Sequence, residues 1–79
     1  MSNEVYKIVW LDIVRPNDTW VFEEEARDLK PARIETIGWV LENKKDFIIF
    51  YSSRGDDRQL GDINCIPKSV ILELKQIPK

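Results

Sequence analysis

Residue types that commonly carry catalysis are scarce in this chain of 79 residues. Histidine is absent, so the commonest general base is missing and neither a Ser/His nor a Cys/His nucleophile pair can be built. The single cysteine, Cys65, can form no internal disulfide, and a zinc site would lack its usual histidine ligands. The composition therefore argues against an enzyme, and we expect no cofactor and no bound metal.

A polar connection holds the carboxylates that come closest to a metal site. Asp56 and Asp57 precede Asp62 there, and carboxylate oxygens suit divalent cations. Asp and Gly also serve turns through their own backbone geometry, so the connection is explained without a cation. Arg54-Gly55-Asp56, which spells the tripeptide read by integrins in extracellular proteins, is interpreted as part of the same turn.

Arginine and aromatic side chains offer a more specific binding hypothesis. An arginine side chain can donate two hydrogen bonds to one phosphate group, and an aromatic ring can stack on a base. The combination therefore suits a small anionic ligand such as a nucleotide. We predict that loops converging at one end of the fold supply the ligand-binding residues Arg15, Trp20, Tyr51, Ser53, Arg54, Arg58 and Lys68. The alternative is that these are solvated surface charges paired with neighbouring aspartates.

Alternating apolar and polar residues predict that β-strands position these side chains. The central feature is a hairpin over residues 34–52, in which apolar stretches at 34–41 and 47–51 flank a charged turn at 42–46. Residues 5–14, 60–66 and 70–77 are typical of three further strands. Gly38 predicts a bulge or bend that curls the sheet toward closure, and Cys65 is expected to face the core together with Ile63.

The connection after the first strand predicts one short helix. Asp18 or Thr19 can serve as its N-cap, Phe22, Ala26 and Leu29 recur along one face, and Pro31 ends it. The acidic residues between them are most simply a solvated helix face.

Two of the predicted strands, residues 5–14 and 47–51, are apolar on both faces. A chain of this length forms one domain, residues 1–79, and buries only about 60% of its unfolded surface, so some apolar surface needs a second cover. The helix is one candidate cover, and another copy of the chain is the other. For a homo-oligomer we predict the interface residues Trp10, Trp39, Ile48 and Phe50.

Charge and hydropathy limit the partners and the compartment. The formal net charge of −2 gives no basic footprint, which argues against non-specific nucleic-acid binding. No apolar run approaches the ~20 residues of a membrane span, and the N-terminus lacks the basic and apolar regions of a signal peptide. We therefore expect a cytoplasmic protein without membrane association.

The order of a strand, a helical insertion, three meandering strands, a one-turn break and a last strand resembles the SH3-like small barrel and its Sm-like relatives. The Asp46-Phe47 step and the Pro67-Lys68-Ser69 turn match positions typical of Sm-like proteins. Bacterial Sm-like RNA chaperones differ, because they carry a histidine beside that lysine and place their helix before the first strand. The resemblance implies a mainly β fold, a small five-stranded barrel with one short α-helix inserted after the first strand.

Three stretches are more similar to a group of small uncharacterised bacterial and bacteriophage proteins of this fold. They are residues 29–32, residues 36–41, and the pair Gly61-Asp62 followed by residues 66–69. The resemblance implies a non-catalytic, self-associating module in a host cytoplasm, where a phage protein can sequester a nucleotide immune signal. The alternatives are an Sm-like RNA- or DNA-binding adaptor and a protein-interaction module without a small ligand.

Overall fold

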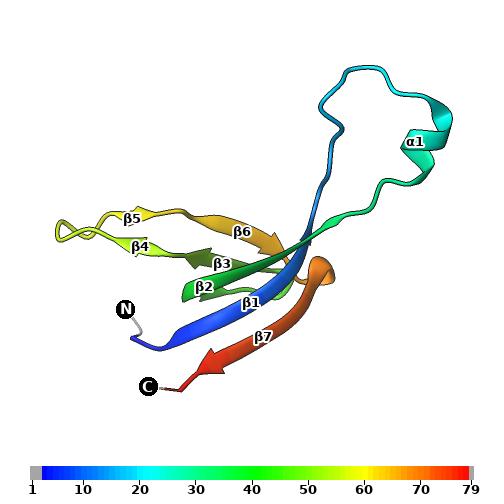
Figure 1. Cartoon of the computed structure of the whole chain (residues 1–79). Coiled ribbons are helices and arrows are strands. Elements are labelled where there is room, and N and C mark those ends of the chain that lie inside the picture. The colour runs from blue at the N-terminus through cyan, green and yellow to red at the C-terminus, as the bar shows by residue number, and fades with distance from the viewer. Residues whose placement is uncertain (1–2, 79) are drawn as a thin grey trace.

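A computed structural model describes residues 3–78 and shows an antiparallel sheet from which one long connection projects (Figure 1). The five strands lie in the order β6-β3-β2-β1-β7. Their bounds are β1 Val5–Asp12, β2 Ala32–Asn43, β3 Phe47–Tyr51, β6 Asn64–Pro67 and β7 Ile71–Ile77. Strands β4 (Ser53–Arg54) and β5 (Leu60–Gly61) form a separate two-stranded hairpin, and the helices are α1 (Glu23–Arg27) and the 3-10 turn η1 (Lys68–Val70). The predicted mainly β fold, with one short helix after the first strand, is confirmed.

The main core cluster lies on one face of the curled sheet, opposite the face to which the buried Val9 and Tyr51 point. Ile8, Ile48, Phe50 and Ile66 are at most 2% exposed there. They come from alternate positions of β1, β3 and β6, as the period of two in a strand requires. Partly buried residues complete the cluster: Tyr6, Trp10, Val40, Val70 and Ile71.

The sheet is open and is not closed into the predicted barrel. Strands β6 and β7 form its two edges, and no pairing joins them within residues 3–78. Register shifts between Val9 and Trp10 and between Val40 and Glu42 bend the strands. Such bulges increase twist and curvature, but here they do not bring one edge onto the other.

Gly38 marks the closest approach of β2 to β3. A Cβ atom built on Gly38 would lie 2.2 Å from the carbonyl oxygen of Tyr51. The bulge itself lies beyond Gly38, between Val40 and Glu42. The glycine is therefore required by the close approach of two backbones, which is one of the meanings of glycine inside a strand.

The connection between β1 and β2, residues 13–31, forms an arm that points away from the sheet (Figure 1). The Cα radius of gyration is 15.7 Å, whereas a compact domain of this length has about 12 Å. Helix α1 begins after Phe22 without a side-chain cap, so the predicted N-cap at Asp18 or Thr19 is wrong. The helix contains no buried residue, so it does not cover an apolar face of the sheet.

Asp62 separates β5 from β6. Its φ is 56°, a left-handed conformation that interrupts the strand. After this interruption Ile66 is buried and Cys65 is exposed. The prediction that Cys65 and Ile63 face the core is wrong, because the inward-facing alternate positions are those of Asn64 and Ile66, and Ile63 and Cys65 are exposed. Within residues 3–78 no helix is long and apolar enough to cross a membrane.

Candidate functional site

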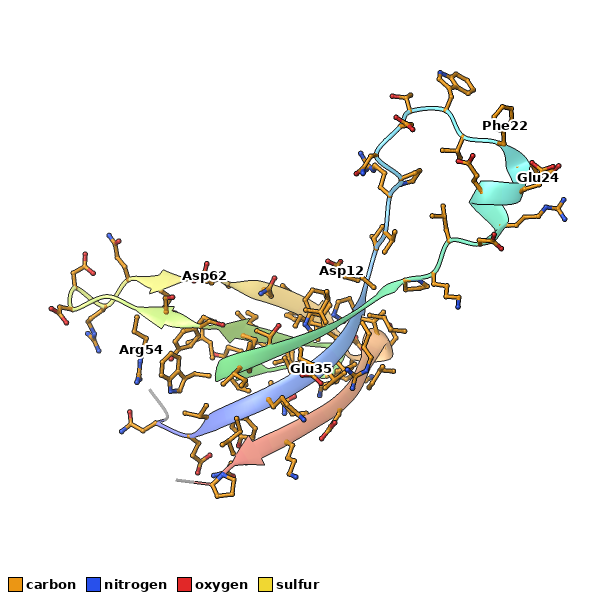
Figure 2. The ribbon with its side chains drawn as sticks, in the orientation of Figure 1. Asp12, Phe22, Glu24, Glu35, Arg54 and Asp62 are labelled. Atoms are coloured by element: carbon orange, nitrogen blue, oxygen red, sulfur yellow. The ribbon has the colours of Figure 1, made fainter. Side chains whose placement is uncertain are left out.

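One cluster of stacked side chains, here called the arginine–aromatic stack, contains Trp39, Tyr51 and Arg54. The pairing of β2 with β3 sets Trp39 opposite Tyr51, and their ring centroids lie 5.4 Å apart with an interplanar angle of 27°. The Cζ atom of Arg54 lies 3.9 Å from the centroid of the Trp39 ring. Figure 2 shows Arg54 beside the β4–β5 hairpin, at the opposite end of the molecule from Phe22 and Glu24 on the arm.

Exposure increases from the bottom of the stack to its top. Tyr51 is 1% exposed, Trp39 is half-buried, and Arg54 is exposed. The guanidinium is therefore held in place on the protein side by an aromatic ring, and its donors remain available to the solvent. A cation–π contact of this kind contributes about 0.5–1 kcal/mol at an exposed position, enough to orient the side chain without locking it.

The indole nitrogen of Trp39 adds an unusual feature to the stack. Its Nε1 atom is buried and has no hydrogen-bond partner among residues 3–78. A buried donor without a partner costs about 1–3 kcal/mol, so such groups are rare in folded proteins. An acceptor brought close to this nitrogen would recover part of that cost.

The β4–β5 hairpin carries two other predicted ligand-binding residues. Ser53 donates its hydroxyl to Asp62 Oδ2 at 2.8 Å, so this hydroxyl is already engaged. Arg58 lies in the turn, where its φ is 70° and its backbone N–H donates to the Gly55 carbonyl at 3.2 Å. Arg58 is exposed beside two aspartates, so its charge is partly offset locally.

The seven predicted ligand-binding residues do not converge on one site. Tyr51, Ser53, Arg54 and Arg58 lie on β3 and the β4–β5 hairpin. Arg15 and Trp20 lie on the arm, at the other end of the molecule (Figure 1). Lys68 begins η1, where its backbone N–H donates to the Asp46 carbonyl at 2.8 Å. Convergence was wrong because the connection after β1 projects away instead of folding over the sheet.

The predicted oligomer interface also needs correction. Ile48 and Phe50 are 2% and 0% exposed within one chain, so they are core residues with no surface for a partner. Trp10 packs against the same core, and its Nε1 donates to Thr36 Oγ1 at 3.1 Å. Trp39 belongs to the arginine–aromatic stack. The alternation showed that both faces of β3 are apolar, but it did not show which face is the core.

Sequence reasoning missed several features of the surface. It did not assign Trp39 to the ligand site, because counting the register back from the hairpin turn sets Val40 opposite Tyr51, and only the bulge between Val40 and Glu42 brings Trp39 to that position. It also missed that the most exposed large apolar side chains belong to the arm, with Ile13 and Trp20 about nine-tenths exposed. No signal in the sequence distinguishes such residues from a helix face packed on the sheet.

The described carboxylates offer no metal centre. Within residues 3–78 there is no group of three or more His, Cys, Asp or Glu side chains placed to hold a metal ion. Asp62 instead accepts a hydrogen bond from Ser53, and Asp57 accepts one from the backbone of Gln59 at 3.3 Å. These contacts support the turn interpretation of the polar connection.

Comparison of the chain with protein-family models, with curated proteins and with solved structures finds no match. The chemistry of the arginine–aromatic stack therefore rests on its own geometry.

Proposed function

We propose that this protein is a non-catalytic, self-associating binding module that holds a small anionic ligand with a planar ring, such as a nucleotide, on the arginine–aromatic stack. The observation that carries the proposal is the 3.9 Å approach of the Arg54 Cζ atom to the Trp39 ring, which is itself stacked on Tyr51. A guanidinium held in this way can donate two hydrogen bonds to one phosphate group, and planar bases stack on guanidinium planes as well as on aromatic rings.

The contacts available on one chain set the expected affinity. A stacked base contributes about 1–3 kcal/mol and a hydrogen bond to a charged group about 1.5–3 kcal/mol. Their sum does not exceed about 6 kcal/mol, which corresponds to a dissociation constant of tens of micromolar or weaker. The stack is therefore suited to a ligand present at micromolar or higher concentration.

Two further parts of the proposal draw on the resemblance. The strand order supports an opened relative of the SH3-like or Sm-like barrel, because β7 lies beside β1 and β1, β2 and β3 follow as a meander. The proposed role, in a phage context, is to hold a nucleotide immune signal of the host without consuming it. A nucleic-acid adaptor is less well supported, because the arginines of the β4–β5 hairpin and Arg15 of the arm lie at opposite ends and form no continuous basic surface (Figure 1).

Fluorescence of a single tryptophan tests the ligand site. Replacing Trp10 and Trp20 by phenylalanine leaves Trp39 as the only indole, and the protein is then titrated separately with ATP, adenosine and inorganic phosphate. We expect ATP to quench Trp39, and adenosine and phosphate each to bind more weakly than ATP, because each makes only part of the contacts.

Two variants that each remove one positive charge test whether Arg54 binds ATP. Arg54→Gln is expected to weaken ATP binding by at least about tenfold, since it removes one charge-assisted contact. Arg27→Gln removes the same charge from the exposed face of α1 and should leave binding unchanged. Equal affinities of the two variants, or no quenching by ATP at millimolar concentrations, would contradict the proposed function.

A further inference from the structure

Strand β7 is the longer of the two edge strands of the open sheet. It runs from Ile71 to Ile77, pairs with β1 along one side and has no strand along the other within residues 3–78 (Figure 1). Every second residue of an edge strand directs its N–H and C=O groups away from the sheet. Such a row of unpaired groups is a template for a further strand.

The two edges differ in how well they are shielded. Strand β6 has four residues, carries no charged side chain and ends in Pro67, which has no N–H to donate. Strand β7 contains no proline, and Pro78 follows only after its last residue. The register shift beside Trp10 affects only the start of β7. The edge of β7 is therefore the one that is open to pairing.

Two opposite charges on β7 have no partner in their own chain. Glu73 and Lys75 lie opposite Val9 and Lys7 of β1, on the face of the sheet that points away from the main core cluster. Neither side chain makes an ion pair with any of residues 3–78. Lys75 lies directly opposite Lys7, and like charges in this position are destabilising. An acidic side chain on the open side of β7 would offset this repulsion.

We propose that two copies of this chain pair their β7 strands antiparallel about a two-fold axis at Leu74, so that one continuous sheet runs through both copies. In this register Glu73 of each copy lies opposite Lys75 of the other, and the two Leu74 side chains meet on the face of the sheet that carries Ile8. Each copy gives and receives the same contacts, as a two-fold interface requires. The inference rests on the self-association in the proposed function and does not depend on ligand binding.

Charge selects this register among the antiparallel ones. An axis at Glu73 would set the two glutamates opposite each other, and an axis at Lys75 would do the same with the two lysines. An axis between two residues would join the core face of one copy to the outer face of the other, because side chains alternate along a strand. Only the axis at Leu74 pairs opposite charges and keeps both core faces on one side.

The same charges identify a second copy as the occupant of the edge. Glu73-Leu74-Lys75 read in the reverse direction is Lys-Leu-Glu, so the segment is its own electrostatic complement. Strand β6 of another copy offers no charge for either residue. A single strand pair is a small interface, of the size that is typical of transient complexes. We therefore expect a weak dimer whose population increases with protein concentration.

Charge reversal combined with sedimentation equilibrium tests the register. We expect the wild type to approach twice the 9.3 kDa mass of one chain at millimolar concentration. Glu73→Lys and Lys75→Glu should each dimerise at least about tenfold more weakly, because each sets like charges opposite each other. An equimolar mixture of the two variants should dimerise again, since both cross-strand pairs are then attractive. Glu24→Lys makes the same charge change on the exposed helix α1 and is the matched control, which should behave like the wild type.

The outcomes separate this inference from the proposed function. A wild type that stays monomeric at millimolar concentration would overturn both the strand pairing and the self-association, whereas the fluorescence titration judges ligand binding independently. Single variants that dimerise like the wild type, or a mixture that does not dimerise, would overturn the strand pairing alone. A mass above that of two chains would also overturn it, because β7 would then pair with a different edge of the next copy.

A disulfide at the axis tests the contact directly. In a Cys65→Ser background, Leu74→Cys places the two new thiols opposite each other, at a Cα separation of about 4.5–5.5 Å that permits a disulfide, and mild oxidation should give a covalent dimer. Leu72→Cys is the control, because Leu72 is 58% exposed and Leu74 only 38%. In the proposed register the two copies of residue 72 lie about 13 Å apart along the strands, too far for a disulfide. Equal or faster cross-linking of the Leu72→Cys protein, with both variants shown to be folded by circular dichroism, would overturn the pairing.

Discussion

Replacing Gly38 by alanine is expected to destabilise the protein and disturb the arginine–aromatic stack together. The added Cβ would lie 2.2 Å from the Tyr51 carbonyl oxygen, 3.0 Å from its carbonyl carbon and 3.1 Å from Cε1 of Phe50. The two nearest atoms are backbone of the paired strand and cannot rotate away. Phe50 and Tyr51 are both buried, so relief requires β2 and β3 to separate.

The expected loss in the free energy of unfolding follows from the kind of contact that the added Cβ would make. Overpacking a core costs about 1–3 kcal/mol, and a clash with backbone belongs at the upper end, about 3 kcal/mol. For a domain of this size each kcal/mol lowers Tm by about 4–8 °C, so Gly38→Ala should lose roughly 12–24 °C. None of the three glycines adopts a positive φ, so the entropy that alanine removes from the unfolded chain is similar for all three replacements.

The other two glycines are matched controls for the assay. Alanine at Gly61 would meet Ser53 Cβ at 3.3 Å. Alanine at Gly55 would come within 2.8 Å of the Asp57 side chain, which can move away, and its contacts with Gln59 at 3.7 and 3.8 Å are ordinary ones. Thermal and urea unfolding of the three variants, followed by circular dichroism, should place Gly38→Ala far below the others. A free energy of unfolding within about 0.5 kcal/mol of Gly61→Ala would refute the close approach of β2 to Tyr51.

Three further predictions concern the core, a titrating tyrosine and the arm. Ile8→Ala should lower the free energy of unfolding in urea by about 2–5 kcal/mol because Ile8 is fully buried, and Ile37→Ala should change it little because Ile37 is 58% exposed. The Tyr6 hydroxyl donates to the Glu4 carboxylate, and this bond raises the pKa of Tyr6 above its ordinary 10.0. The bond therefore stabilises the fold below pH 10.0, and this stabilisation is lost as the pH rises through the raised pKa. Glu4→Gln should lower the pKa of Tyr6 in a titration of phenolate absorbance. Arg27→Ala should change the free energy of unfolding by less than about 0.5 kcal/mol, because its ion pair is exposed.

The strands were largely predictable because alternation is a local signal. The hairpin predicted at residues 34–41 and 47–51 is present as β2 (Ala32–Asn43) and β3 (Phe47–Tyr51). Residues 60–66 were harder, since the left-handed Asp62 interrupts the strand and the alternation alone does not say which of the two faces is the core. Composition alone does not reveal such a conformation, because aspartate also occurs in uninterrupted strands.

The arm was not predictable for a different reason. The spacing of Phe22, Ala26 and Leu29 predicted an apolar helix face. The short helix is present, but Phe22 and Leu29 lie outside Glu23–Arg27 and both are exposed. Helical periodicity does not say what covers that face, and the same pattern serves a helix packed on its own sheet and a helix packed on a partner. The candidate binding residues on this segment, Arg15 and Trp20, were consequently assigned to the wrong end of the molecule.

Strand β2 connects the arm to the arginine–aromatic stack, so coupling between the two surfaces would have to pass along it. The strand leaves the arm at Ala32, pairs with β1 along its first half and reaches Trp39 beyond Gly38. Coupling between distant sites requires an element with two discrete arrangements. Strand β2 pairs with β1 over residues 32–38 and with β3 from Trp39 onward, and the buried Ile8 and Phe50 on these two neighbours favour the single arrangement that the structure shows. We therefore expect Trp20→Ser/Phe22→Ser, which changes only the arm, to bind ATP within about twofold of the protein that keeps its arm, a ratio worth about 0.4 kcal/mol. A tenfold difference measured by calorimetry would show that the arm influences the stack, and that β2 has a second arrangement.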